Sequence, residues 1–209
     1  MKPKHRRLLL ASASPRRREL LRQLDIPFRT ATAEIREYSD KDDHLAPREI
    51  CLANATAKAR TVGRRYPRDL ILGADTEVVL GSRVLGKPES RREAARFLAS
   101  LSGRTHEVIT AVCLLCHEAG WRLSFTEATD VTFHTLSPRR IARYLAAVNP
   151  LDKAGAYAIQ ENGEWIIERI EGSLTNVVGL PLAALRRALA QVPPAIWPGG
   201  GVARYRASR

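Results

Sequence analysis

The sequence predicts an α/β domain in which helices flank a mixed β-sheet. Its 209 residues are 44% hydrophobic and 27% charged, which is enough apolar material for one sizeable core. Strand-forming runs alternate with segments of helical periodicity along the chain. No apolar run approaches the roughly 18 residues that a membrane-spanning helix needs. The pattern is therefore typical of a globular protein and not of an integral membrane or disordered one.

The first third of the chain predicts one strand followed by two helices. The apolar run at 8–11 indicates a buried strand. Ser14-Pro15 then opens a helix, because Ser favours the N-cap and Pro the first turn. A second helix is expected over 47–65, with an apolar face made of Ile50, Ala53, Ala57 and Val62.

The middle of the chain predicts a hairpin, a helix and two long strands. Gly81-Ser82 is expected to form the turn between the β-rich run 70–80 and the segment RVLGKP. Ser90 and Glu93 form a capping box that begins the next helix. Two strands joined by a turn are then expected at HEVITAVCLL, 106–115, and LSFTEATDVTF, 123–133.

The last third predicts two helices and two strand-like runs. Ser137-Pro138 repeats the Ser-Pro helix opening, and Pro181 begins a last helix through Ala190. The apolar runs that resemble strands are WIIERI, 165–170, and TNVVGL, 175–180. We expect a single domain over residues 1–192 and, at 193–209, a flexible tail that is Pro/Gly-rich and then basic.

The net charge of +12 is concentrated at the two ends of the chain. Residues 1–22 hold eight Lys or Arg and one acid, and residues 192–209 add three Arg and no acid. Basic ends attract many polyanions and identify no function. The apolar run near the N-terminus is too short for a signal peptide, and three cysteines suit a reducing compartment, so a cytoplasmic protein is expected.

The segment LLLASASPRRRELL predicts an anion site. A buried strand leads through a Ser-rich loop into a helix N-terminus, whose free N–H groups attract anions. Arg16, Arg17 and Arg18 oppose the dipole of that helix, at a cost of about 0.3–1 kcal/mol each. A bound phosphate would reverse the sign, and guanidinium groups suit its several oxygens. The alternative is that these arginines are solvated or paired with nearby carboxylates.

Asp75 is the second candidate, because it lies within the apolar run LILGADTEVVL. A buried carboxylate is costly unless it is paired or binds a metal. Beside a phosphate site, it suits a Mg²⁺ ligand or a base, and the alternative is a structural Asp that caps the next turn. The chain has no GxxxxGK[ST] loop, no GxSxG turn and no paired zinc motif.

Taken together, these strings resemble the Maf family of nucleoside triphosphate pyrophosphatases, in particular its dTTP/UTP branch. The resemblance covers about residues 8–190 and rests on SPRR, AKAR, GADTEVVL, GKP, LSGRTHEVITAV, DVTFHTLSPRRIARYL, PLDKAGAYAIQ and NVVGLPL in the family's order. It implies a fold like that of the inosine triphosphate pyrophosphatases, with two lobes around a cleft. It also implies a divalent metal cation, Mg²⁺ or Mn²⁺, and a homodimer.

The resemblance assigns roles to individual residues. Asp75 is expected to be the catalytic proton acceptor and, with Glu37, a metal ligand, while Glu34 is an alternative to Glu37. Phosphate and substrate contacts are expected from Ser14, Arg16, Arg17, Lys58 and Lys87. The residues expected to set base specificity, all of the dTTP/UTP type, are Arg16, Thr76 and Gln160.

The expected reaction is hydrolysis of dTTP or UTP to the nucleoside monophosphate and pyrophosphate, with water attacking the α-phosphorus. It would remove surplus or modified nucleotides from the pool. One alternative is a pyrophosphatase for another modified nucleotide, such as 7-methyl-GTP. The other is a basic module that binds nucleotide or nucleic acid without catalysis, although such a module gains nothing from Asp75. Neither a specific nucleic acid nor a membrane is an expected partner.

Overall fold

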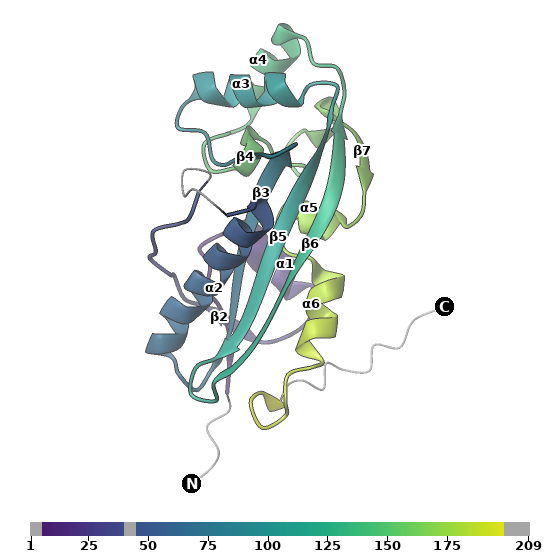
Figure 1. Ribbon diagram of the computed structural model, residues 1–209. Helices are drawn as coiled ribbons and strands as arrows, with labels where there is room; N and C mark the ends of the chain where they lie inside the picture. The colour runs from purple at the N-terminus through teal and green to yellow at the C-terminus, as the bar shows by residue number, and fades with distance from the viewer. Residues whose placement is uncertain (1–5, 40–44, 199–209) are drawn as a thin grey trace, which may run out of the picture.

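The computed structural model describes residues 6–39 and 45–198 and shows a seven-stranded mixed sheet with helices on both faces (Figure 1). The strand order is β2-β1-β3-β5-β6-β7, and the short β4 pairs with β3. β1 pairs in parallel with β2 and β3, and the other pairings are antiparallel. The predicted α/β class with a mixed sheet is confirmed.

The strands are β1 (Leu8–Leu10), β2 (Phe28–Thr30), β3 (Leu70–Leu80), β4 (Arg83–Leu85), β5 (Thr105–Cys116), β6 (Trp121–Phe133) and β7 (Ile167–Glu171). The helices are α1 (Pro15–Arg22), α2 (Pro47–Arg65), α3 (Arg91–Leu101), α4 (Pro138–Ala147), α5 (Leu174–Val178) and α6 (Leu182–Leu189). Two short 3₁₀ helices, η1 (Ala154–Ala156) and η2 (Gly163–Trp165), lie between α4 and β7. No strand was predicted at β2, whereas α2 and β3 have the predicted bounds.

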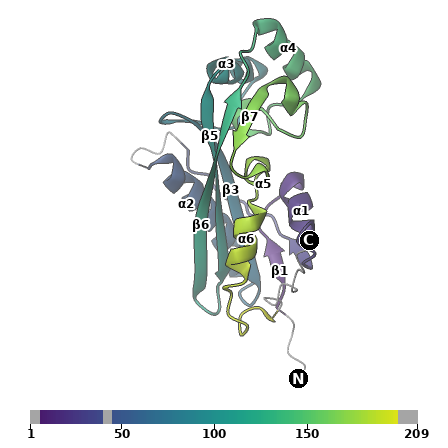
Figure 2. The same ribbon diagram turned by 90° about the vertical axis from the view of Figure 1, so that its right-hand side faces the viewer.

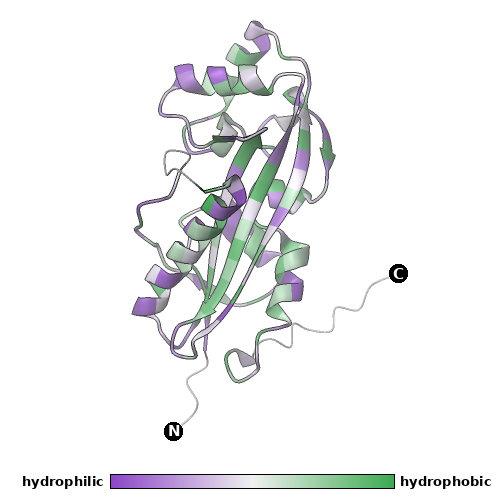
Figure 3. Cartoon of the chain, viewed as in Figure 1, coloured by the Kyte–Doolittle hydropathy of each residue, from purple (hydrophilic) through white to green (hydrophobic). Residues whose placement is uncertain are grey.

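The long strands β3, β5 and β6 run through two lobes. In the lower lobe, α2 covers one face of the sheet, and α1 and α6 cover the other (Figure 2). In the upper lobe, α3 and α4 pack at the far end of the same strands. Separate buried apolar clusters fill these interfaces, and apolar residues follow the strands (Figure 3). The sheet is thus shared, and each lobe has its own core.

Gly73 lets α2 approach β3 closely. A Cβ at this position would collide with the carbonyl oxygen of Ala55 and lie 2.9 Å from the Cβ of Ala59. Only glycine allows that approach between a helix and a strand. The close approach brings Asn54 and Lys58 of α2 to Asp75, which lies two residues beyond Gly73 on the same face of β3.

The close approach also corrects the predicted apolar face of α2. Ala53 and Ala57 are only half-buried. The small residues buried on this helix are instead Cys51, Ala55 and Ala59. Ala55 and Ala59 lie directly against Gly73. The predicted face was therefore wrong at its two central alanines.

The capping box of α3 differs by one residue from the prediction. Ser90 Oγ accepts a hydrogen bond from the Glu93 backbone N–H at 3.2 Å, as expected. The Glu93 carboxylate, however, accepts from the backbone N–H of Glu89 at 2.7 Å. The helix still begins at Arg91, since its orphan donor is capped by Ser90.

The run 175–180 forms helix α5 and not the predicted strand. Ser173 caps the helix by accepting from the backbone N–H of Asn176 at 3.2 Å. The Asn176 side chain donates to the carbonyl of Val108 and to Thr129 Oγ1, and Gly179 ends the helix with φ 119°. Capping and a buried polar anchor outweigh the β-branched residues of this segment.

The packed part of the chain extends beyond the predicted start of the tail at residue 193. Ile196 and Trp197 are buried against the core of the lower lobe. Arg6 Nη1 also donates to the carbonyl of Ala195 at 2.6 Å. The apolar contacts of Ile196 and Trp197 were not expected from the Pro/Gly-rich composition of the segment. Residues 199–209 lie outside the described residues.

Among the described residues, no helix combines the length and apolar character needed to cross a membrane.

The upper-lobe core contains a buried imidazole, His106, whose Nε2 lies 2.7 Å from Tyr157 Oη. Its ring also contacts Phe133 edge-on. Burial lowers the pKa of His106 to about 4.

This imidazole predicts acid sensitivity. The unfolded ring takes up a proton near its ordinary pKa, whereas the folded ring resists until about pH 4. The contribution of neutral His106 to stability is therefore complete at neutral pH. The free energy of unfolding should fall by about 2 kcal/mol between about pH 6.5 and 4.5, as the unfolded ring gains its proton. Chemical denaturation should show a smaller fall in His106→Gln, which cannot titrate. Equal pH dependence in both proteins would contradict this.

Candidate active site

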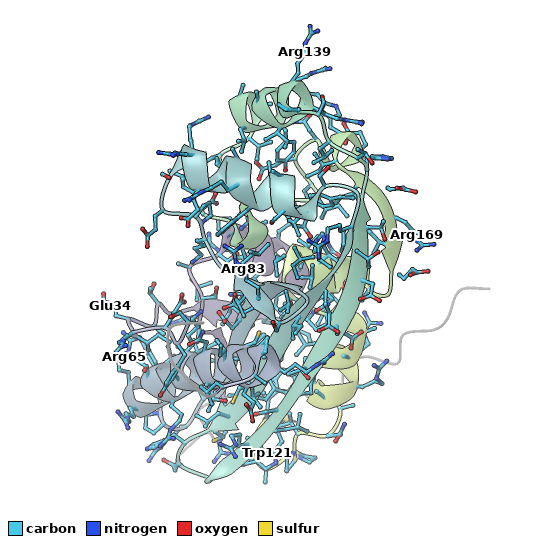
Figure 4. All side chains as sticks on the ribbon, turned by 45° about the horizontal axis from the view of Figure 1, so that its top comes forward. Glu34, Arg65, Arg83, Trp121, Arg139 and Arg169 are labelled. Carbon is cyan, nitrogen blue, oxygen red and sulfur yellow. The ribbon has the colours of Figure 1, made fainter. Side chains whose placement is uncertain are left out.

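A cavity of about 680 Å³ lies where the two lobes meet. It opens beyond the end of β1, because β1 stops at Leu10, opposite Leu72, while β3 continues into the upper lobe. Its lining includes Phe97 of α3 and Arg83, which is labelled in Figure 4. The structure brings all the predicted site residues to this cavity: Ser14, Arg16, Arg17, Glu37, Lys58, Asp75, Thr76, Lys87 and Gln160.

The Ser-rich loop and the start of α1 form one wall. Ser14 caps α1, and its Oγ accepts from the backbone N–H of Arg17 at 3.4 Å. No acidic residue lies in the first turn of this helix. Arg17 crosses the cavity floor, because its Nε donates to the carbonyl of Gly179 at 2.9 Å and its Nη2 to Thr76 Oγ1 at 2.8 Å. The positive end of α1 therefore faces the cavity with Arg16 and Arg17 in the lining, whereas Arg18 is not among the lining residues.

Burial lowers the pKa of the Arg17 guanidinium, although the nearby carboxylates of Asp75 and Glu37 oppose that shift. Arg16 is different. Its Nη1 lies 3.6 Å from Asp152 Oδ2 and 4.0 Å from Glu161 Oε1. The alternative of pairing with nearby carboxylates is thus partly correct for Arg16, and these pairs are long and half-exposed.

A lysine between two carboxylates forms the opposite wall. Lys58 Nζ lies 2.6 Å from Asp75 Oδ1 and 2.6 Å from Glu37 Oε1. Asn54 Nδ2 donates to Asp75 Oδ2 at 3.2 Å, and its amide also pairs with the backbone of Tyr38. Asp75 is only 6% exposed, so this pairing offsets the cost of burying its charge. Asn54 was not predicted.

Glu37, and not Glu34, faces the lysine. Burial alone would raise the pKa of Glu37, but its hydrogen bond with Lys58 and the charge of that lysine hold the pKa below its ordinary value. Glu34 lies at the periphery near Arg65 (Figure 4) and is not among the residues that line the cavity. The structure therefore favours Glu37 of the two candidates.

Glu77 is a carboxylate that the sequence analysis missed. It lies two residues beyond Asp75, so both side chains point to the same face of β3. Burial, with the charges of Asp75 and Glu37, raises the pKa of Glu77 to about 8. The spacing of two residues in a strand was the available signal.

The acidic wall fits a cation that is shared with phosphate. Within the described ranges, no group of three or more His, Cys, Asp or Glu side chains is arranged to hold a metal by itself. Asp75 and Glu37 nevertheless supply oxygen donors of the kind that Mg²⁺ prefers, and such ions commonly take the rest of their ligands from substrate phosphates and water. Glu77, on the same face of β3 as Asp75, adds a third carboxylate to the cavity lining.

Comparisons with known proteins identify the family to which the chain is similar. A family model described as Maf-like protein matches residues 7–192. The dTTP/UTP pyrophosphatase of Moorella thermoacetica is 48% identical over 191 residues, which cover 91% of this chain and 97% of that protein. The dTTP/UTP pyrophosphatase of Gloeobacter violaceus is 45% identical over 185 residues, or 88% and 95%.

A solved structure, the nucleoside-triphosphatase / dITP/XTP pyrophosphatase of Mycobacterium abscessus, matches with a TM-score of 0.44 and 17% identity. The match covers 90% of this chain and 99% of that one. A similarity of this size is too small to support an inference about the site.

The two neighbouring arginines should differ in their effect on stability. Arg17→Ala removes two hydrogen bonds from a charged donor and should lower the free energy of unfolding by about 2 kcal/mol. Arg16→Ala is the matched control, and it should change stability by less than about 0.5 kcal/mol, because its ion pairs are long and half-exposed. Urea denaturation measures both, and equal losses would contradict the bridging role of Arg17.

Proposed function

We propose, because this chain belongs to the Maf-like protein family, that it is a nucleoside triphosphate pyrophosphatase acting on dTTP and UTP. The products are the nucleoside monophosphate and pyrophosphate, and the reaction removes surplus or modified nucleotides from the pool. The observation that carries the proposal is the buried Asp75 paired with Lys58 at a cavity whose other wall is a cationic helix N-terminus. Relatives named dTTP/UTP pyrophosphatase support the choice of substrate.

The triphosphate lies across the cationic residues of the cavity. An ammonium group has three N–H donors, and Lys58 uses two on Asp75 and Glu37, so one remains for a phosphate oxygen. Arg16, Arg17 and Lys87 complete the set. Positive charge around the β- and γ-phosphates stabilises the leaving pyrophosphate, which is the main contribution of protein groups to such chemistry.

Asp75 accepts the proton of the attacking water. A carboxylate has about four lone-pair positions, and hydrogen bonds from Lys58 and Asn54 occupy two of them in the free protein. The water oxygen forms a bond to the α-phosphorus as its proton passes to Asp75. The bond from that phosphorus to the bridging oxygen breaks, and pyrophosphate leaves with the electron pair.

A divalent cation, Mg²⁺ or Mn²⁺, belongs to the proposal, with Asp75 and Glu37 as its protein ligands. When bound, such an ion neutralises phosphate charge and acidifies bound water. A cytoplasmic location, a homodimer and the base-specific roles of Arg16, Thr76 and Gln160 stay predictions.

A binding module without catalysis explains the site less well. A polyanion binder gains nothing from the buried carboxylate of Asp75, which faces the same cavity as the arginines. A pyrophosphatase for another base keeps the whole mechanism and differs only at the base end. Comparing substrates therefore distinguishes this alternative from the dTTP/UTP enzyme, whereas mutating the phosphate-binding residues does not.

Purified protein should release pyrophosphate from dTTP and UTP faster than from other nucleoside triphosphates, including 7-methyl-GTP, with Mg²⁺ or Mn²⁺ and not with EDTA. Asp75→Asn should lower kcat by at least about 100-fold, because an amide cannot accept the proton. Its circular dichroism and Tm should stay close to those of the unmodified protein. Preference for another base would overturn the substrate assignment, and near-normal turnover by Asp75→Asn would remove Asp75 from its role.

A further inference from the structure

Lys153, between α4 and η1, is buried although it lines the cavity, and its side chain is only 4% exposed. Its Nζ lies 2.7 Å from the carbonyl oxygen of Asn149, 2.9 Å from Asp152 Oδ1 and 3.2 Å from Glu161 Oε1. The first two contacts are hydrogen bonds and the third is an ion pair, so all three tie the ammonium group to the segment 149–161.

The two carboxylates held by Lys153 also face Arg16. Asp152 Oδ2 and Glu161 Oε1 lie 3.6 Å and 4.0 Å from Arg16 Nη1, and the Asp152 carbonyl accepts from Arg16 Nη2 at 3.4 Å. Burial would raise the pKa of Asp152, but Lys153 and then Arg16 hold it below its ordinary value. These half-exposed pairs add little stability, so their main effect is on the direction of the Arg16 side chain.

The same lysine closes the loop that carries Gln160. Lys153 stands at the start of this loop and Glu161 at its end, so their ion pair joins the two ends. Between them, Gly155 and Ala156 adopt φ values of 66° and 65°. A left-handed conformation is rare for alanine and costs on the order of 1 kcal/mol, and such strain persists only where the surroundings impose it.

We propose that Lys153 is a positioning residue for base recognition. By holding Asp152 and Glu161, it sets the directions of Arg16 and Gln160 at the nucleoside end of the cavity. This inference rests on the proposed function, since it concerns the choice among nucleoside triphosphates. Lys153 acts through these two carboxylates.

Replacement of Lys153 should change the kinetics differently if the residue only stabilises the fold than if it positions the base-binding side chains. Loss of a structural contact lowers stability and reduces the turnover of every nucleotide by a similar factor. Loss of positioning alters KM more than kcat, and it does so unequally among bases, because uniform binding to the phosphates is retained. The ratio of kcat/KM values for two bases therefore separates the two roles.

The test compares Lys153→Met with Arg68→Met, using UTP, dTTP, CTP and GTP. Arg68 pairs with Glu118 at 2.9 Å and is absent from the cavity wall, so it is a matched surface control. Lys153→Met should lower the UTP/CTP and UTP/GTP ratios of kcat/KM by about tenfold, mainly through KM for UTP. Arg68→Met should leave these ratios within about twofold of the unmodified protein.

Glu161→Gln provides a second variant, because this half-exposed side chain is replaceable without unfolding the protein. It should shift the ratios in the same direction even if Lys153→Met folds poorly. A double-mutant cycle adds Arg16→Ala, which should cost much less in the Lys153→Met background than alone, since both act through one arrangement.

Unchanged base ratios in folded Lys153→Met and in Glu161→Gln would overturn the positioning role, as would fully multiplicative effects in the cycle. If the unmodified protein hydrolyses no nucleoside triphosphate, the proposed function fails and this inference fails with it. These failures are distinguishable, because the first requires an active unmodified enzyme.

Discussion

The buried charge of Asp75 is the constraint on which the rest of the site depends. A carboxylate inside the central strand is costly unless cations and amides surround it. α2 supplies both, through Lys58 and Asn54, and Gly73 lets that helix come close enough to do so. Asn54 also holds the backbone at Tyr38, next to Glu37, so a single helix–strand contact assembles the whole acidic wall.

The topology explains why this wall faces a cationic one. β1 ends early beside β3, and the chain turns at once into the N-terminus of α1, at the carboxyl end of a parallel strand pair. β3 continues into the upper lobe, and its alternation sends Asp75 toward α2 and Thr76 toward Arg17. Both faces of one strand thus border the same cavity, with Asp75 and Lys58 on one side and Thr76 and Arg17 on the other.

Short sequence patterns predicted the helix and strand bounds that depend on neighbouring residues. α2 and β3 have the bounds that Pro47 and the apolar run at 70–80 indicate, and the site residues named from short motifs meet at one cavity. Contacts between distant segments decided the rest. Helix α5 depends on a buried hydrogen bond from Asn176 to β5, and the burial of Trp197 depends on the lower-lobe core. The bridges of Lys153 are equally invisible in a sequence, because its partners are identified only by the folded loop.

The proposed reaction begins with attack of water at the α-phosphorus, with Asp75 taking the proton. Hydrolysis of UTP in ¹⁸O-labelled water, followed by mass spectrometry of both products, tests this most directly. Attack at the α-phosphorus places one label in UMP and none in pyrophosphate. Label in pyrophosphate with unlabelled UMP would mean attack at the β-phosphorus, and would contradict the account.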